Sequence, residues 1–220
     1  VTNIDFLEDS VVVKTEKLHT ATKVVLALPP KLWSNNIKFS PSLPVELKDI
    51  ALTTHTWMES SIKTALTYKQ PFWRDKKQSG TFFSSYGPIT ELYDHCNSKE
   101  NKYALGGFIH LRFKNMSAAE RKNSVIKHIT SVFGNQANDF IDYNEVVWNN
   151  ENETFSENIA SLYPHQNNGN LIFKNNHFKN RLLISSAEAS EISPGYMDGA
   201  VNSANFVVEK IKADNDIHEK

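Results

Sequence analysis

The alternation of apolar and polar positions predicts that much of the chain forms short strands. The run KVVLAL at residues 23–28 is continuously apolar, as expected for a buried strand, and Pro29-Pro30 ends it because proline cannot donate to a β-ladder. Residues 61–70 (SIKTALTYKQ) alternate instead, which is typical of a half-buried strand. The predicted strands are residues 1–6, 11–15, 23–28, 61–70, 81–86, 103–111 and 182–186.

Three segments have the spacing of helices. The clearest is residues 118–133, where Ser117 and Glu120 form a capping-box pattern and Gly134 is the expected C-cap. A shorter helix is predicted from near Pro44 to residue 52, and a last one over residues 200–211. The positions expected to be buried are Val125, Ile126, Ile129, Val132 and Phe133 in the clearest helix, and Ala200, Val201, Ala204, Val207, Val208 and Ile211 in the last.

Other segments depart from regular patterns. Residues 149–180 lack periodicity and are rich in Asn and Gly, and a connection of this length inside a compact domain is usually functional. Gly106-Gly107, inside a predicted strand, indicates a bulge or a close approach of another backbone. The chain opens into strand-like sequence at Val1 without an initiator Met, so we expect an upstream segment to be missing.

Composition and charge restrict the classes of function. The 220 residues are 40% hydrophobic and 22% charged, an ordinary globular composition. The net charge of -1 gives no general attraction for nucleic acid or an anionic membrane, and no apolar run reaches the roughly 18–20 residues needed to span a bilayer. The only cysteine, Cys96, excludes an intramolecular disulfide and fits a reducing compartment, so a cytoplasmic location is expected. The histidines lack metal-ligand spacing and are interpreted as structural or surface residues.

Several segments, taken in order, resemble the C-terminal half of flavin-containing monoamine oxidases. They are the opening VTNID with VVVKT, then LALPPKLW, SSIKTALTYKQPFWR, Trp148 with the irregular stretch behind it, and LLISSAEASEISPGYMDGAVNSANFVVEKI. The resemblance covers almost the whole chain and implies an α+β fold with a mixed-sheet substrate domain flanked by helices. It implies FAD-domain strands at residues 1–29, the substrate-binding domain at 30–165, and the C-terminal strand and helix of the FAD domain at 166–220.

The resemblance also assigns roles to individual residues. Lys63 matches a lysine that holds a water near the flavin and assists reoxidation by O₂, whereas base rates alone favour a solvated strand lysine. Tyr196 matches one aromatic wall of the amine site, and Met197 matches a residue whose N–H contacts the reduced flavin at the start of a helix. A turn that packs a helix onto the core is the alternative for both.

Three further residues match cofactor contacts. Glu188 corresponds to the acid of a Gly-Thr-Glu motif near the ribityl chain and pyrophosphate, with a surface glutamate as the alternative. Val1 matches a position whose backbone pairs with the adenine, and Trp148 matches a tryptophan near the flavin. Both could equally be ordinary strand residues.

The sequence departs from the family pattern at several points. Ser186-Ala187 replaces Gly-Thr, and Ile159-Ala160 replaces the stretch that carries the flavin-linked cysteine of covalent members, so FAD is expected to bind noncovalently. The second aromatic of the amine site also aligns near Ala160, and Tyr163 or Phe155 is a possible substitute. No G-x-G-x-x-G loop occurs, so this chain alone is expected to be inactive and to lack FAD, and the missing N-terminal FAD-binding segment becomes its expected partner.

The resulting hypothesis is an FAD-dependent amine oxidase that acts on a small-molecule amine. Hydride passes to the flavin, and O₂ then reoxidises it. One alternative is a non-catalytic or degenerate substrate-domain module, which the replacements at Ser186-Ala187 and Ile159-Ala160 favour. Another is a desaturase or porphyrinogen-type oxidase of the same fold, although these generally lack the lysine that Lys63 matches.

Overall fold

The computed structural model describes residues 1–156 and 162–218, and residues 215–218 by their backbone alone. The chain divides into two compact units, of which the first comprises Val1–Trp57 with Glu153–Lys220 and the second Met58–Asn152. Helices and strands occur in both, so the predicted α+β class is confirmed. The boundaries expected at 29/30 and 165/166 separate FAD-domain segments from the substrate-binding domain, and this functional assignment stays a prediction.

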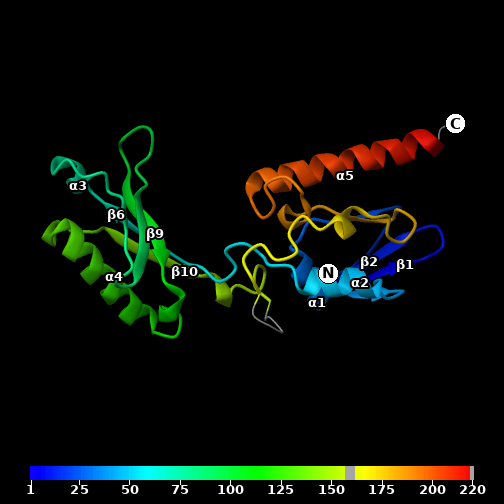
Figure 1. The fold of residues 1–220 in the computed structure, drawn as a ribbon, viewed down its shortest axis with the longest axis horizontal. Coiled ribbons are helices and arrows are strands. Elements are labelled where there is room, and N and C mark those ends of the chain that lie inside the picture. Colours follow the sequence, from blue (N-terminus) through cyan, green and yellow to red (C-terminus); the bar gives the residue numbers. More distant parts are fainter. Residues whose placement is uncertain (157–161, 219–220) are drawn as a thin grey trace. The chain divides into compact units, whose positions relative to one another are not determined.

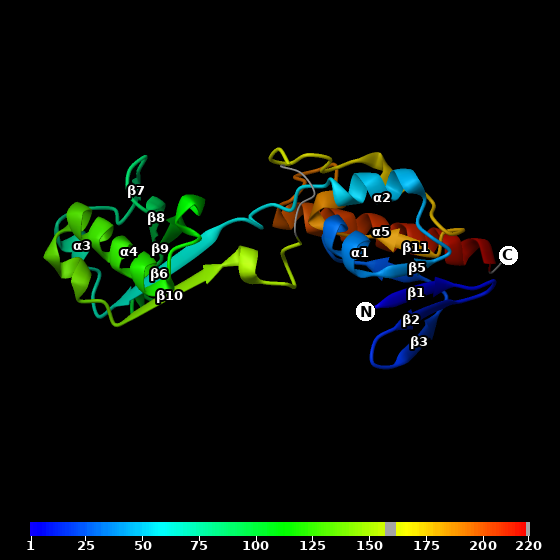
Figure 2. The same ribbon diagram turned by 90° about the horizontal axis from the view of Figure 1, so that it is seen from below.

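The first unit is built around two small sheets. Its elements are β1 (Asn3–Phe6), β2 (Val11–Lys14), β3 (Leu18–Ala21), β4 (Val24–Leu26), α1 (Pro30–Asn36), β5 (Lys38–Ser40), α2 (Val45–Leu52), η4 (Leu171–Lys174), β11 (Leu182–Ile184), η5 (Ala187–Ala189) and α5 (Met197–His218). One sheet has the order β3-β2-β1-β5 and is mixed, because β1 and β5 run parallel while the other pairs are antiparallel (Figure 2). The other is a parallel pair, β4 with β11.

Helix α5 runs along one side of the first unit, and α1 and α2 lie on the other side (Figure 1). It packs through Gly199, Ser203 and Val207, which are spaced four residues apart. A side chain at Gly199 would collide with the carbonyl oxygen of Ser193, so this close packing requires glycine. The helix therefore approaches the unit through small residues.

The apolar positions of α5 lie mostly on its outer side. The sequence predicted that these positions are buried, and this prediction was wrong for most of them. Val207 is buried, but Val201 is 59% exposed and Val208 is 47% exposed. Ala200 and Ala204 are exposed as well, and Ile211 is half-buried. The outer stripe of α5 is defined here as Met197, Val201, Ala204 and Val208, all of them exposed.

The second unit is an antiparallel sheet covered on one face by a helix. Its elements are β6 (Ile62–Tyr68), α3 (Phe72–Asp75), β7 (Phe82–Phe83), β8 (Ile89–Asp94), β9 (Tyr103–Ile109), η1 (Leu111–Phe113), α4 (Ala118–Phe133), η2 (Asn135–Asn138), β10 (Asp142–Val147) and η3 (Trp148–Asn150). The strand order is β10-β6-β9-β8-β7, and every pairing is antiparallel rather than mixed as expected. A Cβ at Gly107 would collide with the carbonyl oxygen of Glu91, which confirms the predicted close approach of two backbones.

Helix α4 begins and ends as predicted. Ser117 and Glu120 form both hydrogen bonds of the capping box, and Gly134 ends the helix with φ 90°. Val125, Ile129 and Phe133 are buried and Ile126 is half-buried, whereas Val132 is exposed, so its predicted burial was wrong. The buried face instead includes a charged residue, Arg121.

Arg121 ties α4 to the edge strand β10. Its Nη2 lies 2.6 Å from Glu145 Oε1, and the two side chains are only 7% and 10% exposed. Arg121 also donates to the carbonyl oxygen of Lys114 at 3.1 Å, and Tyr143 Oη donates to Glu145 Oε2 at 2.7 Å. The buried charges are thus paired and hydrogen-bonded, as burial requires.

Every helix in the described part of the chain is too short or too polar to cross a membrane. Among the same residues, no group of three or more His, Cys, Asp or Glu side chains is arranged to hold a metal ion.

Candidate functional site

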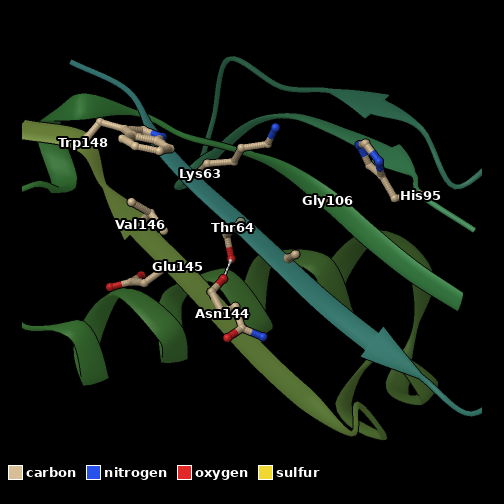
Figure 3. Close-up of a pocket in the computed structure, with 9 residues that line it drawn as sticks. Lys63, Thr64, His95, Gly106, Asn144, Glu145, Val146 and Trp148 are labelled. Carbon is tan, nitrogen blue, oxygen red and sulfur yellow. Dashed lines mark hydrogen bonds between the residues drawn. The ribbon is translucent and has the colours of Figure 1, made fainter. Parts of the chain in front are cut away.

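The open face of the sheet in the second unit carries a pocket of about 330 Å³ (Figure 3). Strand β6 alternates, so Ile62, Thr64 and Leu66 are buried in the core shared with α4, while Lys63 points to the opposite face. Thr64 Oγ1 donates to the carbonyl oxygen of Asn144 at 3.1 Å and helps fix β10 beside β6. The pocket is lined by Lys63, Thr64, Ala65, His95, Gly106, Asn144, Glu145, Val146 and Trp148.

Lys63 is exposed, as the alternative of a solvated strand lysine also expects, and its cross-strand neighbours are apolar or aromatic. It pairs with Val146 of β10 on one side and Phe108 of β9 on the other. Its Nζ lies 5.6 Å from the centre of the Phe108 ring, within the range of a cation–π contact. Figure 3 shows the amine extending from β6 on the same side of the sheet as Trp148. The ammonium therefore projects into the open pocket.

Trp148 follows directly after β10 and begins η3. Its backbone N–H donates to the carbonyl oxygen of Ser61 at 3.1 Å, which holds this turn beside the start of β6 and brings the indole close to Lys63. Two of the candidate residues from the sequence, Lys63 and Trp148, thus line the same pocket.

Four polar residues that line the pocket were missed, namely Thr64, His95, Asn144 and Glu145. The His95 ring covers Gly106, where an added Cβ would lie 2.8 Å from His95 Cδ2. The glycine pair at 106–107 was the available signal for such a close neighbour, but the sequence did not show which side chain would occupy the space.

Glu188 lies in η5 in the first unit and is only 5% exposed, so the alternative of a surface glutamate is wrong. Nearby Ser186 is buried, and its Oγ has no hydrogen-bond partner among the described residues. The carbonyl oxygen of Ala187 accepts from Gly195 N at 3.0 Å, which fixes η5 to the turn before α5.

The polar groups of this region match those that FAD presents. A buried hydroxyl without a hydrogen-bond partner can bind a polar group of a ligand, and a buried carboxylate accepts hydrogen bonds from the hydroxyl groups of a ribityl chain. Ser186 and Glu188 provide these two groups beside the start of α5, with which η5 is in contact. The residues present therefore fit the cofactor that the family resemblance implies.

The start of α5 provides the remaining polar groups. The first N–H groups of a helix have no intrahelical partner, and the positive end of the helix dipole lies there. Met197 is the first residue of this helix and is exposed, and Tyr196 immediately before it is 49% exposed. The start of α5 thus presents donors beside an accessible phenol ring.

Other predicted residues lie elsewhere in the first unit. Val1 precedes β1 and is exposed. Of the proposed substitutes for the second aromatic wall, Tyr163 is exposed and the ring centre of Phe155 lies 5.6 Å from Lys31 Nζ, and their role stays a prediction. Ile159-Ala160 falls outside the described residues. The ring that stacks on Tyr196 is His165, at 5.7 Å between ring centres.

Comparison with known proteins decides the family. The sequence profile described as flavin containing amine oxidoreductase matches residues 1–212. The chain belongs to the flavin-containing amine oxidoreductase family. The match confirms the resemblance predicted from the sequence. It also confirms that the family of this chain consists of flavin-containing oxidoreductases.

Curated members of the flavin-containing amine oxidoreductase family are longer than this chain. The probable flavin-containing monoamine oxidase A of Dictyostelium discoideum is 30% identical over 196 residues, which cover 86% of this chain and 41% of the relative. Putrescine oxidase of Kocuria rosea is 32% identical over 145 residues, which cover 64% of this chain and 30% of the relative. The chain thus spans less than half the length of these relatives.

Two solved structures show the same fold. Putrescine oxidase bound to putrescine aligns with a TM-score of 0.80 at 23% identity, over 96% of this chain and 48% of that one. Cyclohexylamine oxidase from Brevibacterium oxydans aligns with a TM-score of 0.78 at 21% identity, over 94% of this chain and 48% of that one.

Proposed function

We propose that this chain supplies substrate-facing and cofactor-facing residues of an FAD-dependent oxidase that oxidises a small-molecule amine. The observation that carries the proposal is the pocket in which Lys63 projects beside Trp148 (Figure 3), in a member of a flavin-containing family. When bound, FAD supplies the hydride acceptor for oxidation of the C–N bond, and O₂ restores its oxidised form.

Residues of the first unit would hold the cofactor. Glu188 accepts hydrogen bonds from hydroxyl groups, and Ser186 Oγ gains the partner that it lacks. The N–H groups at Met197 and the positive end of the α5 dipole favour negative charge. Binding is noncovalent in this proposal, because Ile159-Ala160 stands where covalent relatives carry cysteine.

Lys63 would serve the oxygen reaction. Its ammonium offers three donors and a positive charge, and its cross-strand neighbours Val146 and Phe108 carry no charge that would compete for an anion. A fixed charge of this kind stabilises negative charge as it develops on oxygen. Trp148, beside it, limits the room for water in the same pocket.

Tyr196 would meet the amine. An accessible aromatic face attracts an ammonium group through its quadrupole and suits the apolar part of an organic amine. The relatives named for the oxidation of putrescine and cyclohexylamine support an amine as the substrate class.

The proposal requires a second segment, because the phosphate-binding G-x-G-x-x-G loop does not occur in the 220 residues. The first unit offers it a surface. The parallel sheet of β4 and β11 has only two strands, fewer than a sheet normally needs, and the outer stripe of α5 is exposed. We infer that a dinucleotide-binding segment of βαβ type, the expected N-terminal partner, covers these surfaces.

Replacement of Lys63 by Met in the complete flavin-loaded protein tests this function. After anaerobic reduction by an amine, mixing with O₂ in a stopped-flow spectrometer should show reoxidation about 100-fold slower than in the unmodified protein, the usual loss for one electrostatic donor. Lys69→Met, an exposed position just after β6, is the matched control and should leave the rate unchanged.

Equal reoxidation rates in the Lys63→Met variant and the unmodified protein would remove Lys63 from the reaction. A flavin that no amine reduces would refute amine oxidation and favour the non-catalytic module.

A further inference from the structure

Three aromatic rings meet just ahead of α5. The rings of Trp57 and His165 are 4.5 Å apart with planes at 19°, and those of His165 and Tyr196 are 5.7 Å apart with planes at 26°. Trp57 and Tyr196 complete the triangle at 5.9 Å. These three residues are called the ring cluster. All of them belong to the first unit, although they come from three separate segments of the chain.

The backbone around His165 is held in an uncommon conformation. His165 and Asn167 have φ values of 59° and 58°, in the left-handed region that residues other than glycine rarely adopt. Hydrogen bonds fix this loop, since His165 N donates to His55 Nδ1 at 3.2 Å and Asn167 Nδ2 donates to Thr53 Oγ1 at 2.8 Å. Strained backbone persists where its surroundings over-determine it, and it concentrates at functional sites.

The orientation of the imidazole is also fixed. Asn168 Nδ2 lies 3.4 Å from His165 Nδ1, within hydrogen-bonding distance, and this contact helps to hold the ring. Gly195, with φ 82°, lets the chain before Tyr196 close onto the cluster, since an added Cβ would lie 3.3 Å from Trp57 Cβ and 3.5 Å from His165 Nδ1.

The distance between the two ring centres shows the role of His165 beside Tyr196. Ring centres 5.7 Å apart are those of rings in contact, so no ligand fits between the two. His165 therefore supports the phenol ring and does not face it across a binding space. Tyr196 remains 49% exposed, which leaves part of its ring free for a ligand.

We propose that His165 is a positioning residue for the amine site: together with Trp57 it fixes the ring of Tyr196 at the angle at which its free face receives an organic ammonium ion. This inference rests on the proposed function in that Tyr196 contacts the amine. The histidines were interpreted from the sequence as structural or surface residues, and for His165 the inference replaces that interpretation.

The test is binding of benzyltrimethylammonium, a quaternary ammonium ion that carries no oxidisable N–H, to the complete flavin-loaded protein by titration calorimetry. His165→Ala should weaken binding about tenfold, the scale of a desolvated cation–π contact. His165→Phe keeps a stacking ring and should bind within about twofold of the unmodified protein, whereas His165→Gln keeps polar groups without the ring and should resemble alanine. His19→Ala, on the exposed strand β3, is the control and should change nothing.

Kinetics with an oxidisable amine give a second readout, in which His165→Ala should raise KM more than it lowers kcat. Unchanged binding in His165→Ala, equal losses in the Phe and Gln variants, or no probe binding by the unmodified protein would each overturn the role of His165. If the unmodified protein binds the probe but oxidises no amine, the proposed oxidation fails, while the binding series still decides the role of His165.

Discussion

The two units of this chain differ in how completely they bury their apolar surface. The second has a five-stranded antiparallel sheet, a well-capped helix and a single core that joins β6, β8, β9 and α4. The first has a core as well, but its β4–β11 sheet consists of two strands, and the outer stripe of α5 is exposed. The second unit covers its core with its own elements, whereas the first leaves outer surfaces that we expect a partner to cover.

The ion pairs provide the sharpest test of this comparison. Arg121→Ala would leave Glu145 as a buried, unpaired charge, and we expect a loss of about 3–5 kcal/mol in the unfolding free energy of the second unit. The control is Lys174→Ala in the first unit, which breaks a partly exposed pair with Glu191 and should cost less than about 1 kcal/mol. Urea unfolding followed by fluorescence measures both, and equal losses would contradict the distinction between the units.

A second prediction concerns acid and the second unit. Asp94 accepts hydrogen bonds from Trp73 Nε1 and Arg74 Nε, each at 2.9 Å. Burial alone would raise the pKa of Asp94, but the hydrogen bonds to its carboxylate outweigh burial and hold the pKa well below its usual range. Because the folded-state pKa is depressed, the stabilisation is fully present above the unfolded pKa of about 4 and is lost as pH falls through the folded value.

Asp94→Asn should therefore cost about 2 kcal/mol at pH 7, the scale of hydrogen bonds to a charged group. The difference from the unmodified protein should shrink as the pH is lowered below about 4. Urea unfolding at pH 7 and pH 3 measures it, and an identical difference at the two values would show that the carboxylate charge is not what stabilises this corner.

The smallest effects are expected on α5, where neighbouring valines form a matched pair. Val207→Ala removes buried methyl groups and should cost about 2 kcal/mol, whereas Val208→Ala, on the outer stripe, should change the stability of this chain by less than about 0.5 kcal/mol. Val208→Asp should in addition weaken assembly with the dinucleotide-binding segment. Equal costs for the two alanine variants would mean that the outer stripe is already covered.

The elements predicted correctly are those whose pattern was set by local rules. The helix of residues 118–133 was defined by Ser117, Glu120 and Gly134, and the alternation in β6 placed Lys63 on the open face. Strand β10 was missed because one of its inward positions is Glu145, whose charge is compensated only by Arg121 from another element. A pairing between segments cannot be read from periodicity.

The errors on α5 and at His165 have related causes. Periodicity found the apolar side of α5 correctly but assumed that it faces this chain, whereas the contact with η5 is made through the small-residue side that includes Gly199. His165 carried no local signal, because its neighbours Trp57 and Tyr196 are distant in sequence. The roles of Lys63, Trp148, Glu188 and Met197 came from family resemblance, and the structure adds their burial and neighbours.

The most direct test of the central claim is the visible absorption spectrum of the complete protein that contains this chain. We predict the bands of oxidised, noncovalently bound flavin, which should bleach when an amine is added without oxygen and return when oxygen is admitted. Residues 1–220 purified alone should be colourless, since no phosphate-binding G-x-G-x-x-G loop occurs within them. A complete protein without flavin absorbance would contradict the account.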